Sequence, residues 1–206
     1  MFLAKEYTRP YFFLTPIFKS CIYMTTYIAI LRGINVSGHR VIKMEALKQL
    51  MDELNFQNIQ TYIQSGNVIF QYKNTGFEKL EKKISDAIAS KFDFEVPVVV
   101  LEFEELKNIL EKNPFVIDPT KDIKYLHVTF LATEPEKKNL ADINFNQYLP
   151  DELNIVGKTI YLYCPNGYGT TKLHNGFFES KLKVSATTRN WKTTNELVAI
   201  AGKLIT

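Results

Sequence analysis

The fold of this chain is most constrained by an order of apolar segments that occurs twice. Short runs rich in β-branched and aromatic residues, typical of strands, alternate with segments in which apolar residues recur every three or four positions, typical of helices. The first copy of this order predicts strands at 27–31, 59–64, 67–72 and 96–101 and helices at 44–54 and 75–88. The second predicts strands at 125–131, 153–156, 159–163 and 186–189 and helices at 134–143 and 172–182. Both copies therefore have the order β-α-β-β-α-β.

Two such copies predict an α+β fold of two tandem ferredoxin-like halves with a linking helix and a C-terminal helix. The linking helix is expected at 102–113 and the terminal helix at 193–203. The expected organisation is an N-terminal extension (1–23), a first half (24–101), a linking helix and loop (102–123) and a second half with the terminal helix (124–206). Thr75 with Glu78, and Thr193 with Glu196, have the spacing of capping boxes and predict helix starts at these places.

The charge of the chain is nearly balanced, with 25 Lys and Arg residues against 22 Asp and Glu. Much of the net charge of +3 lies in residues 1–23, so the remainder is close to neutral. Non-specific affinity for DNA or RNA comes from many basic contacts to phosphate, so general nucleic-acid binding is not expected. A local basic pocket is compatible with this balance.

Cys21 and Cys164 are the only cysteines, which leaves no disulfide framework and no paired-cysteine metal or redox motif. This cysteine usage favours a reducing, cytoplasmic environment. The apolar run 11–17 is too short to cross a bilayer and lacks the flanks of a signal peptide, so no membrane association is expected. Because Met24 directly precedes the first strand pattern, residues 1–23 are interpreted as an upstream extension, with a short anchor or arm as the alternative.

The loop between the first strand and the first helix contains Gly33 and Gly38, which have the glycine spacing of a phosphate-binding P-loop. His39 and Arg40 stand where that motif needs Lys and Ser or Thr, so a nucleotide hydrolase of this type is not expected. Backbone amides, together with nearby basic and amide side chains, still suit an anion. The alternative is a structural loop in which the glycines permit a positive φ. The second half has only a short connection at the equivalent place.

Residues 187–191 place Thr187, Thr188, Arg189, Asn190 and the only tryptophan, Trp191, in one turn. This mixture suits a planar or anionic ligand. Alternatively, Arg189 forms an ion pair with a neighbour while Trp191 holds the terminal helix.

Aromatic residues alternate along both predicted hairpins, as in sheets that stack RNA bases. Tyr161 and Tyr163 share one face, as do Val68, Phe70 and Tyr72 in the first half. The specific RNA-binding signature is missing, and burial of the two aromatic sets against each other is the alternative.

Few residues have the spacing of a catalytic or metal site. His39, His127 and His174 form no paired ligand motif, and no hydrolase elbow occurs, so no metal and no cofactor are expected. Cys164 is interpreted either as a neighbour of His174 or as a buried thiol.

Several strings together resemble one family. They are Leu-Arg-Gly-Ile-Asn-Val at 31–36, Thr-Tyr-Ile-Gln-Ser-Gly-Asn at 61–67, Val-Pro-Val-Val-Val at 96–100, Asn-Pro-Phe at 113–115 and Thr-Thr-Arg-Asn-Trp at 187–191. The chain from Met24 onward resembles the bacterial domain-of-unknown-function 1697 family. The resemblance implies a cytoplasmic α+β protein and supplies no chemistry. Ser37 stands where similar proteins often have a second glycine.

The leading hypothesis is a cytoplasmic protein that binds a small anionic or phosphorylated ligand at the loop 32–43. The candidate site residues are Arg32, Gly33, Asn35, Gly38, His39, Arg40, Lys43, Gln64, Ser65, Asn67, Arg189, Asn190 and Trp191. One alternative is an enzyme acting on a phosphoester or nucleotide with His39 as its acid/base group. Another is a protein- or RNA-interaction module with exposed tyrosines on its sheet faces.

Overall fold

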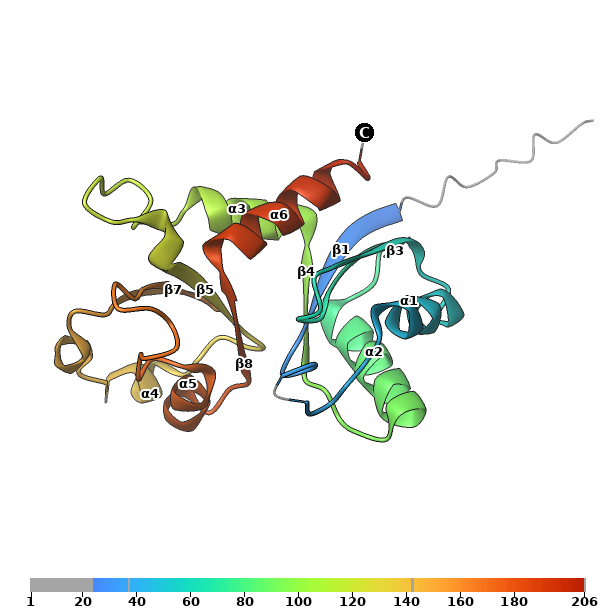
Figure 1. Ribbon diagram of the computed structural model, residues 1–206, viewed down its shortest axis with the longest axis horizontal. Helices are drawn as coiled ribbons and strands as arrows, with labels where there is room; N and C mark the ends of the chain where they lie inside the picture. The colour runs from blue at the N-terminus through green and yellow to red at the C-terminus, as the bar shows by residue number, and fades with distance from the viewer. Residues whose placement is uncertain (1–23, 37, 142, 206) are drawn as a thin grey trace, which may run out of the picture.

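The protein is an α+β fold of two four-stranded antiparallel sheets, as seen in a computed structural model that describes residues 24–36, 38–141 and 143–205 (Figure 1). The first sheet, in the order β2-β3-β1-β4, contains β1 (Met24–Leu31), β2 (Gln57–Tyr62), β3 (Asn67–Lys73) and β4 (Val98–Glu102). The second, in the order β6-β7-β5-β8, contains β5 (Leu126–Leu131), β6 (Glu152–Val156), β7 (Thr159–Tyr163) and β8 (Ala186–Asn190). The expected extension 1–23 and Ser37 lie outside the described residues.

The helices fall into two outer pairs and one bridging pair (Figure 1). The outer pairs are α1 (Met44–Glu53) with α2 (Phe77–Phe92) on the first sheet and α4 (Lys137–Ala141) with α5 (Asn175–Leu182) on the second. The bridging pair, α3 (Phe103–Glu111) and α6 (Trp191–Gly202), packs together and spans both sheets. Short 3-10 turns occur at Ile123–Tyr125 and Phe145–Tyr148. No helix in the described part of the chain is long and apolar enough to span a bilayer.

Strand β1 explains why the first apolar run is continuous rather than alternating. Its odd-numbered residues, such as Tyr27 and Leu31, pack under α1 and α2, whereas Ile28 and Ile30 face the bridging helices. The strand is therefore buried on both faces, and each buried isoleucine stabilises the fold by about 1.5–3 kcal/mol relative to an exposed one. The core under α3 and α6 contains residues from both sheets, which joins the two halves.

Both predicted capping boxes are wrong. Helix α2 begins after Gly76, because the Thr75 hydroxyl donates to the Lys73 carbonyl instead, at 2.8 Å. Helix α6 begins at Trp191, two residues before the predicted start, because Asn190 Oδ1 accepts the Thr193 amide at 2.7 Å. Asparagine is among the best N-cap residues, so this upstream cap defines the helix start.

The outer helices of the second half are shorter than predicted. Among the described residues of the segment 134–143, the α-helix covers Lys137–Ala141, and α5 begins at Asn175 behind a His174 cap. Thr171 does not cap a helix: its hydroxyl donates to Asp151 Oδ2 at 2.6 Å and accepts the Leu173 amide at 3.0 Å. The threonine therefore holds the loop before α5.

The two sets of hairpin aromatics lie in different cores, so the expectation that they bury against each other is wrong. Phe70 stacks between Tyr27 and Phe56 under the outer helices. Tyr161 is buried under α3, where its hydroxyl donates to the Ile109 carbonyl at 3.0 Å, and Tyr163 is half-buried. These side chains therefore form no open aromatic platform of the kind that an RNA-binding sheet face requires.

Candidate functional site

A groove of about 720 Å³ lies where the loop after β1, the β2–β3 turn and strand β8 meet. Of the predicted site residues, it is lined by Arg32, Gly33, His39, Arg40, Ser65, Arg189 and Asn190. Residues that the sequence did not single out as ligand contacts add side chains from both halves: Ile34, Val36, Ile63, Asn175, Thr187, Thr188 and Thr193. Among the residues that the structure describes, no Asp or Glu lines this groove, which we call the arginine groove.

The loop 32–43 is a small hairpin, not a cradle of free backbone amides. The Asn35 amide donates to the Arg40 carbonyl at 3.2 Å, and the His39 amide donates to the Val36 carbonyl at 2.9 Å. Gly33 and Gly38 have φ values of 67° and 77°, which a glycine adopts without strain. The structural interpretation of these glycines therefore describes the loop backbone, and its anion-binding capacity lies in side chains.

The Asn35 side chain holds the loop in place. Its Oδ1 accepts the Ile42 amide at 2.8 Å, and its Nδ2 donates to the carbonyls of Ile42 and Gln64, both at 2.9 Å. Both ends of the amide are thus occupied within the protein. Asn35 positions the groove wall and has no free group for a ligand there.

Arg189 connects the two sheets at the floor of the groove. Its guanidinium donates to Asn67 Oδ1 at 2.6 Å and to the carbonyls of Leu31 and Ser65, each at 2.8 Å. Its remaining donors reach the Thr188 carbonyl and the Thr187 hydroxyl, so its predicted role as a direct ligand clamp does not agree with this geometry.

The partners of Arg189 are all neutral. Arg189 is buried, with 9% of its surface exposed. This burial lowers the pKa of the guanidinium to about 10, so the group is still charged at pH 7. The alternative expectation of an ion pair is also wrong, because no carboxylate accepts from it among the described residues. The groove floor therefore carries a buried positive charge without an anionic partner.

Arg32 and Arg40 differ in their partners. Arg32 forms an ion pair with Glu179 of α5, and the same carboxylate oxygen accepts the Ala186 amide at 3.0 Å. Arg40 is exposed, and its side chain has no hydrogen bond or ion pair within the part of the chain that the structure describes; it lies over Gly33. Arg40 is therefore the groove cation that is most available to a ligand.

The other predicted site residues lie outside the arginine groove. Asn35, Lys43 and Gln64 line a smaller pocket of about 210 Å³ on the other side of the loop. Trp191 lines a third pocket, which shares Asn190 with the groove. Asn67 is buried, and its Nδ2 donates to the Tyr62 carbonyl and the Ser65 hydroxyl.

Histidine and cysteine side chains do not assemble a catalytic centre in the described residues. His39 is exposed and its ring has no partner there, whereas His174 caps α5. Burial of Cys164 raises the pKa of its thiol to about 11, so it is a protonated, buried thiol at pH 7. Within 24–36, 38–141 and 143–205, no three His, Cys, Asp or Glu side chains gather as a metal-binding group.

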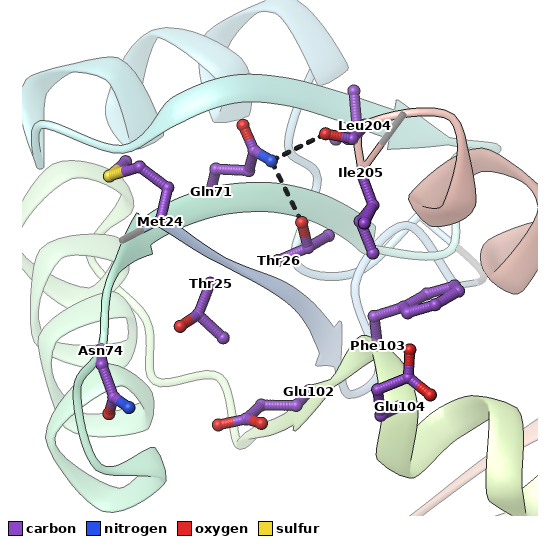
Figure 2. Close-up of a pocket in the computed structure, with 10 residues that line it drawn as sticks. All are labelled: Met24, Thr25, Thr26, Gln71, Asn74, Glu102, Phe103, Glu104, Leu204 and Ile205. Atoms are coloured by element: carbon purple, nitrogen blue, oxygen red, sulfur yellow. Dashed lines mark hydrogen bonds between the residues drawn. The ribbon is translucent and has the colours of Figure 1, made fainter. Parts of the chain in front are cut away.

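A cavity of about 490 Å³ at the opposite end of β1 has the opposite character (Figure 2). Figure 2 shows Glu102 on the same side of the cavity as Thr25 and Asn74, and Glu104 on the other side, next to Phe103. Gln71 Nε2 donates to the Thr26 hydroxyl at 3.2 Å and to the Leu204 carbonyl at 2.9 Å. An anion is repelled here, so the arginine groove is the better candidate site for one.

Comparison with known proteins supports the fold and identifies the family. No curated protein matches the chain in sequence. A solved structure, conserved bacterial protein SP0830 from Streptococcus pneumoniae, is similar with a TM-score of 0.66 and 22% identity, covering 87% of this chain and 99% of that one. A family model described as "Protein of unknown function (DUF1697)" matches residues 24–161. The matched range ends before the segment 187–191. The match confirms the predicted family, and the chain belongs to DUF1697, a family of proteins of unknown function.

Proposed function

We propose that this protein binds a small anionic, phosphorylated ligand in the arginine groove. The observation that carries the proposal is Arg189, a buried cation whose partners within the described part of the chain are neutral, in a groove that no described Asp or Glu lines. A buried charge is costly unless a charge of opposite sign lies nearby. A bound anion supplies that charge.

The three arginines of the groove have different roles in anion binding. Because Asn67 and the carbonyls of Leu31 and Ser65 occupy its donors, Arg189 acts through its field and through the wall it holds in place. Arg40 is free to contact the anion directly. Arg32 keeps guanidinium N–H groups beyond the one that Glu179 accepts, and an Arg–phosphate contact with two parallel hydrogen bonds is among the strongest polar contacts in proteins.

The same proposal includes the finer description of the fold. We infer that each half is a ferredoxin-like unit, an assignment supported by the equivalent strand orders β2-β3-β1-β4 and β6-β7-β5-β8. The proposed boundaries remain 24–101 and 124–206, joined by 102–123, and the proposed compartment is the cytoplasm. With the groove between the two halves, the ligand contacts both.

The test compares two variants of the loop 32–43, each of which replaces one basic residue with glutamine. Arg40→Gln removes the exposed groove cation, whereas Lys43→Gln removes an exposed cation of the same loop that lines the other pocket. Isothermal titration of the full chain with inorganic pyrophosphate is expected to show about tenfold weaker binding for Arg40→Gln, since a charge-assisted hydrogen bond contributes about 1.5–3 kcal/mol.

The Lys43→Gln variant is expected to bind pyrophosphate within about twofold of the unchanged chain, because long-range attraction is screened by salt. Equal losses in the two variants would show general charge attraction instead of a site. Absence of pyrophosphate binding to the unchanged chain would reject the proposed function.

A further inference from the structure

The arginine groove shares one lining residue with a second pocket, of about 570 Å³. Asn190 lines both, as the last residue of β8 and the cap of α6. The second pocket lies between the turn Ile123–Tyr125 and α6, and we call it the tryptophan pocket. The two cavities therefore adjoin at Asn190, at the N-terminal end of α6.

The lining of the tryptophan pocket is mixed, because the charged residues Lys124, Lys192 and Glu196 lie beside Ile123, His127 and Trp191. Trp191 and His127 line it, and the Ile123 side chain is 56% exposed beside them. Tyr168 stacks on His127 with 4.7 Å between the ring centroids. Burial lowers the pKa of His127, so at pH 7 its ring is neutral. The uncharged part of this lining, Ile123 and the two rings, suits a flat, uncharged ring system of a ligand.

Two amide groups at the edge of this pocket are free to recognise a polar ring. Asn190 Oδ1 accepts the Thr193 amide, which leaves Asn190 Nδ2 without a hydrogen-bond partner among the described residues. Asn195 Nδ2 donates to the Trp191 carbonyl at 2.8 Å, which leaves Asn195 Oδ1 free there. The pocket thus offers one donor and one acceptor beside its aromatic wall, the combination that a nucleobase edge satisfies.

We propose that the anionic ligand is a nucleotide, with its phosphates in the arginine groove and its base in the tryptophan pocket. This proposal rests on the proposed function, because it uses the same arginine groove for the phosphates. The sugar then lies beside Asn190, the residue common to both cavities. A phosphorylated sugar without a base leaves the apolar walls formed by Ile123 and Trp191 in contact with water, so we expect it to bind more weakly.

Trp191 is the only tryptophan of the chain, so tryptophan fluorescence reports on the surroundings of this one side chain, which lines the pocket. The full chain is titrated separately with ADP, UDP and inorganic pyrophosphate, without added metal, and both heat and tryptophan fluorescence are recorded. At least one nucleotide is expected to bind about tenfold more tightly than pyrophosphate, since base–aromatic stacking contributes about 1–3 kcal/mol. That nucleotide is expected to change Trp191 fluorescence with the same Kd as the heat signal, whereas pyrophosphate leaves the fluorescence unchanged.

A pair of exposed isoleucines supplies the matched variants. Ile123→Ala removes part of the pocket wall and is expected to weaken nucleotide binding about threefold to tenfold while pyrophosphate binding is unchanged. Ile117→Ala, at an isoleucine that is 85% exposed and outside the pocket, is expected to have no effect on either.

The outcomes separate the two proposals. If pyrophosphate and both nucleotides bind equally and Trp191 fluorescence does not change, the groove binds anions but the nucleotide assignment is wrong. If none of the three binds, the proposed function and the nucleotide assignment fail together. Equal weakening by Ile123→Ala and Ile117→Ala would also overturn the base position.

Discussion

The two sheets have the same strand order but use their last strand differently. Leu101 of β4 pairs with Ile28 of β1, and at the equivalent place in the second sheet Arg189 of β8 pairs with Val128 of β5. The first sheet thus ends in an apolar strand, Val-Val-Val-Leu-Glu, and the second in a polar one, Ala-Thr-Thr-Arg-Asn. The same strand order therefore accepts either an apolar core strand or a polar strand that lines a groove at the edge of the sheet.

The segments that follow the first strand of each sheet, β1 and β5, differ in length. In both sheets the last leucine of that strand donates its amide to the hairpin: Leu31 to the Gly66 carbonyl at 2.7 Å, and Leu131 to the Lys158 carbonyl at 2.9 Å. Beyond this shared contact the first half has the long loop 32–43, and the second half reaches its short helix after the shorter connection 132–136. The long loop of one half therefore faces the polar strand of the other, and the groove needs both.

The largest expected effect comes from giving the second sheet the residue of the first, with Arg189→Leu. The substitution leaves the buried carbonyls of Leu31 and Ser65 and the Asn67 amide oxygen without their donor. Removing one partner of a buried polar network costs about 3–5 kcal/mol, so the variant is expected to unfold at much lower urea concentration. Lys192→Leu, an exposed neighbour, serves as the control; equal midpoints for the two variants would contradict the role of Arg189 as the link between the sheets.

The hairpin glycines provide the second comparison. Gly66 has a φ of 77°, and a Cβ there would lie 2.8 Å from side-chain atoms of Leu31 and Ile34, whereas Gly157 has a φ of 56° with open space around it. Gly157→Ala is expected to cost about 1 kcal/mol from backbone strain alone, and Gly66→Ala about 2–4 kcal/mol because a clash is added. Chemical denaturation measures both; a Gly157→Ala cost as large as that of Gly66→Ala would mean that the close approach is relieved easily.

The ion pair between Arg32 and Glu179 tests whether the loop is tied to the second half. Both side chains are partly exposed, at 29% and 23%, so the coupling between them is expected to be about 0.5–1 kcal/mol. A double-mutant cycle of Arg32→Gln and Glu179→Gln, measured by urea unfolding at low and high salt, checks this value. A coupling free energy of zero at low salt would show that the pair does not stabilise the contact between loop and helix.

The smallest expected effect concerns His127, which stands where the first sheet has Tyr27. Burial lowers the pKa of His127, so the folded state disfavours the protonated ring. Stability is then complete above the unfolded pKa of about 6.5 and decreases as the pH falls below it, because the unfolded chain binds the proton more readily. His127→Phe keeps a ring against Tyr168 and is expected to flatten the loss of unfolding free energy between pH 7 and pH 5. An unchanged slope would assign that loss to other groups.

Much of the architecture was predictable because it depends on patterns between near neighbours in the chain. Apolar residues at helical spacing in 44–54 and 75–88, and the hairpin at Ser65-Gly66, predicted the first half nearly element by element. The errors lie where a local cap competes: Asn190 capped α6 upstream of Thr193, and Thr75 bonded backwards to Lys73. Several local signals of similar strength occur at such boundaries, and only the folded geometry selects one.

The repeated order of strands and helices, the family, and the unusual composition of the loop 32–43 and of the segment 187–191 could all be recognised in the linear sequence. The contacts between these segments depend on the folded chain. Arg189 contacts Leu31 and Asn67, which are 158 and 122 positions away along the chain, and Glu179 lies 147 positions from Arg32. Hydrogen bonds and charge depend on distances of a few ångströms in space, and residues this far apart in sequence acquire such distances only when both sheets have packed on the same pair of helices.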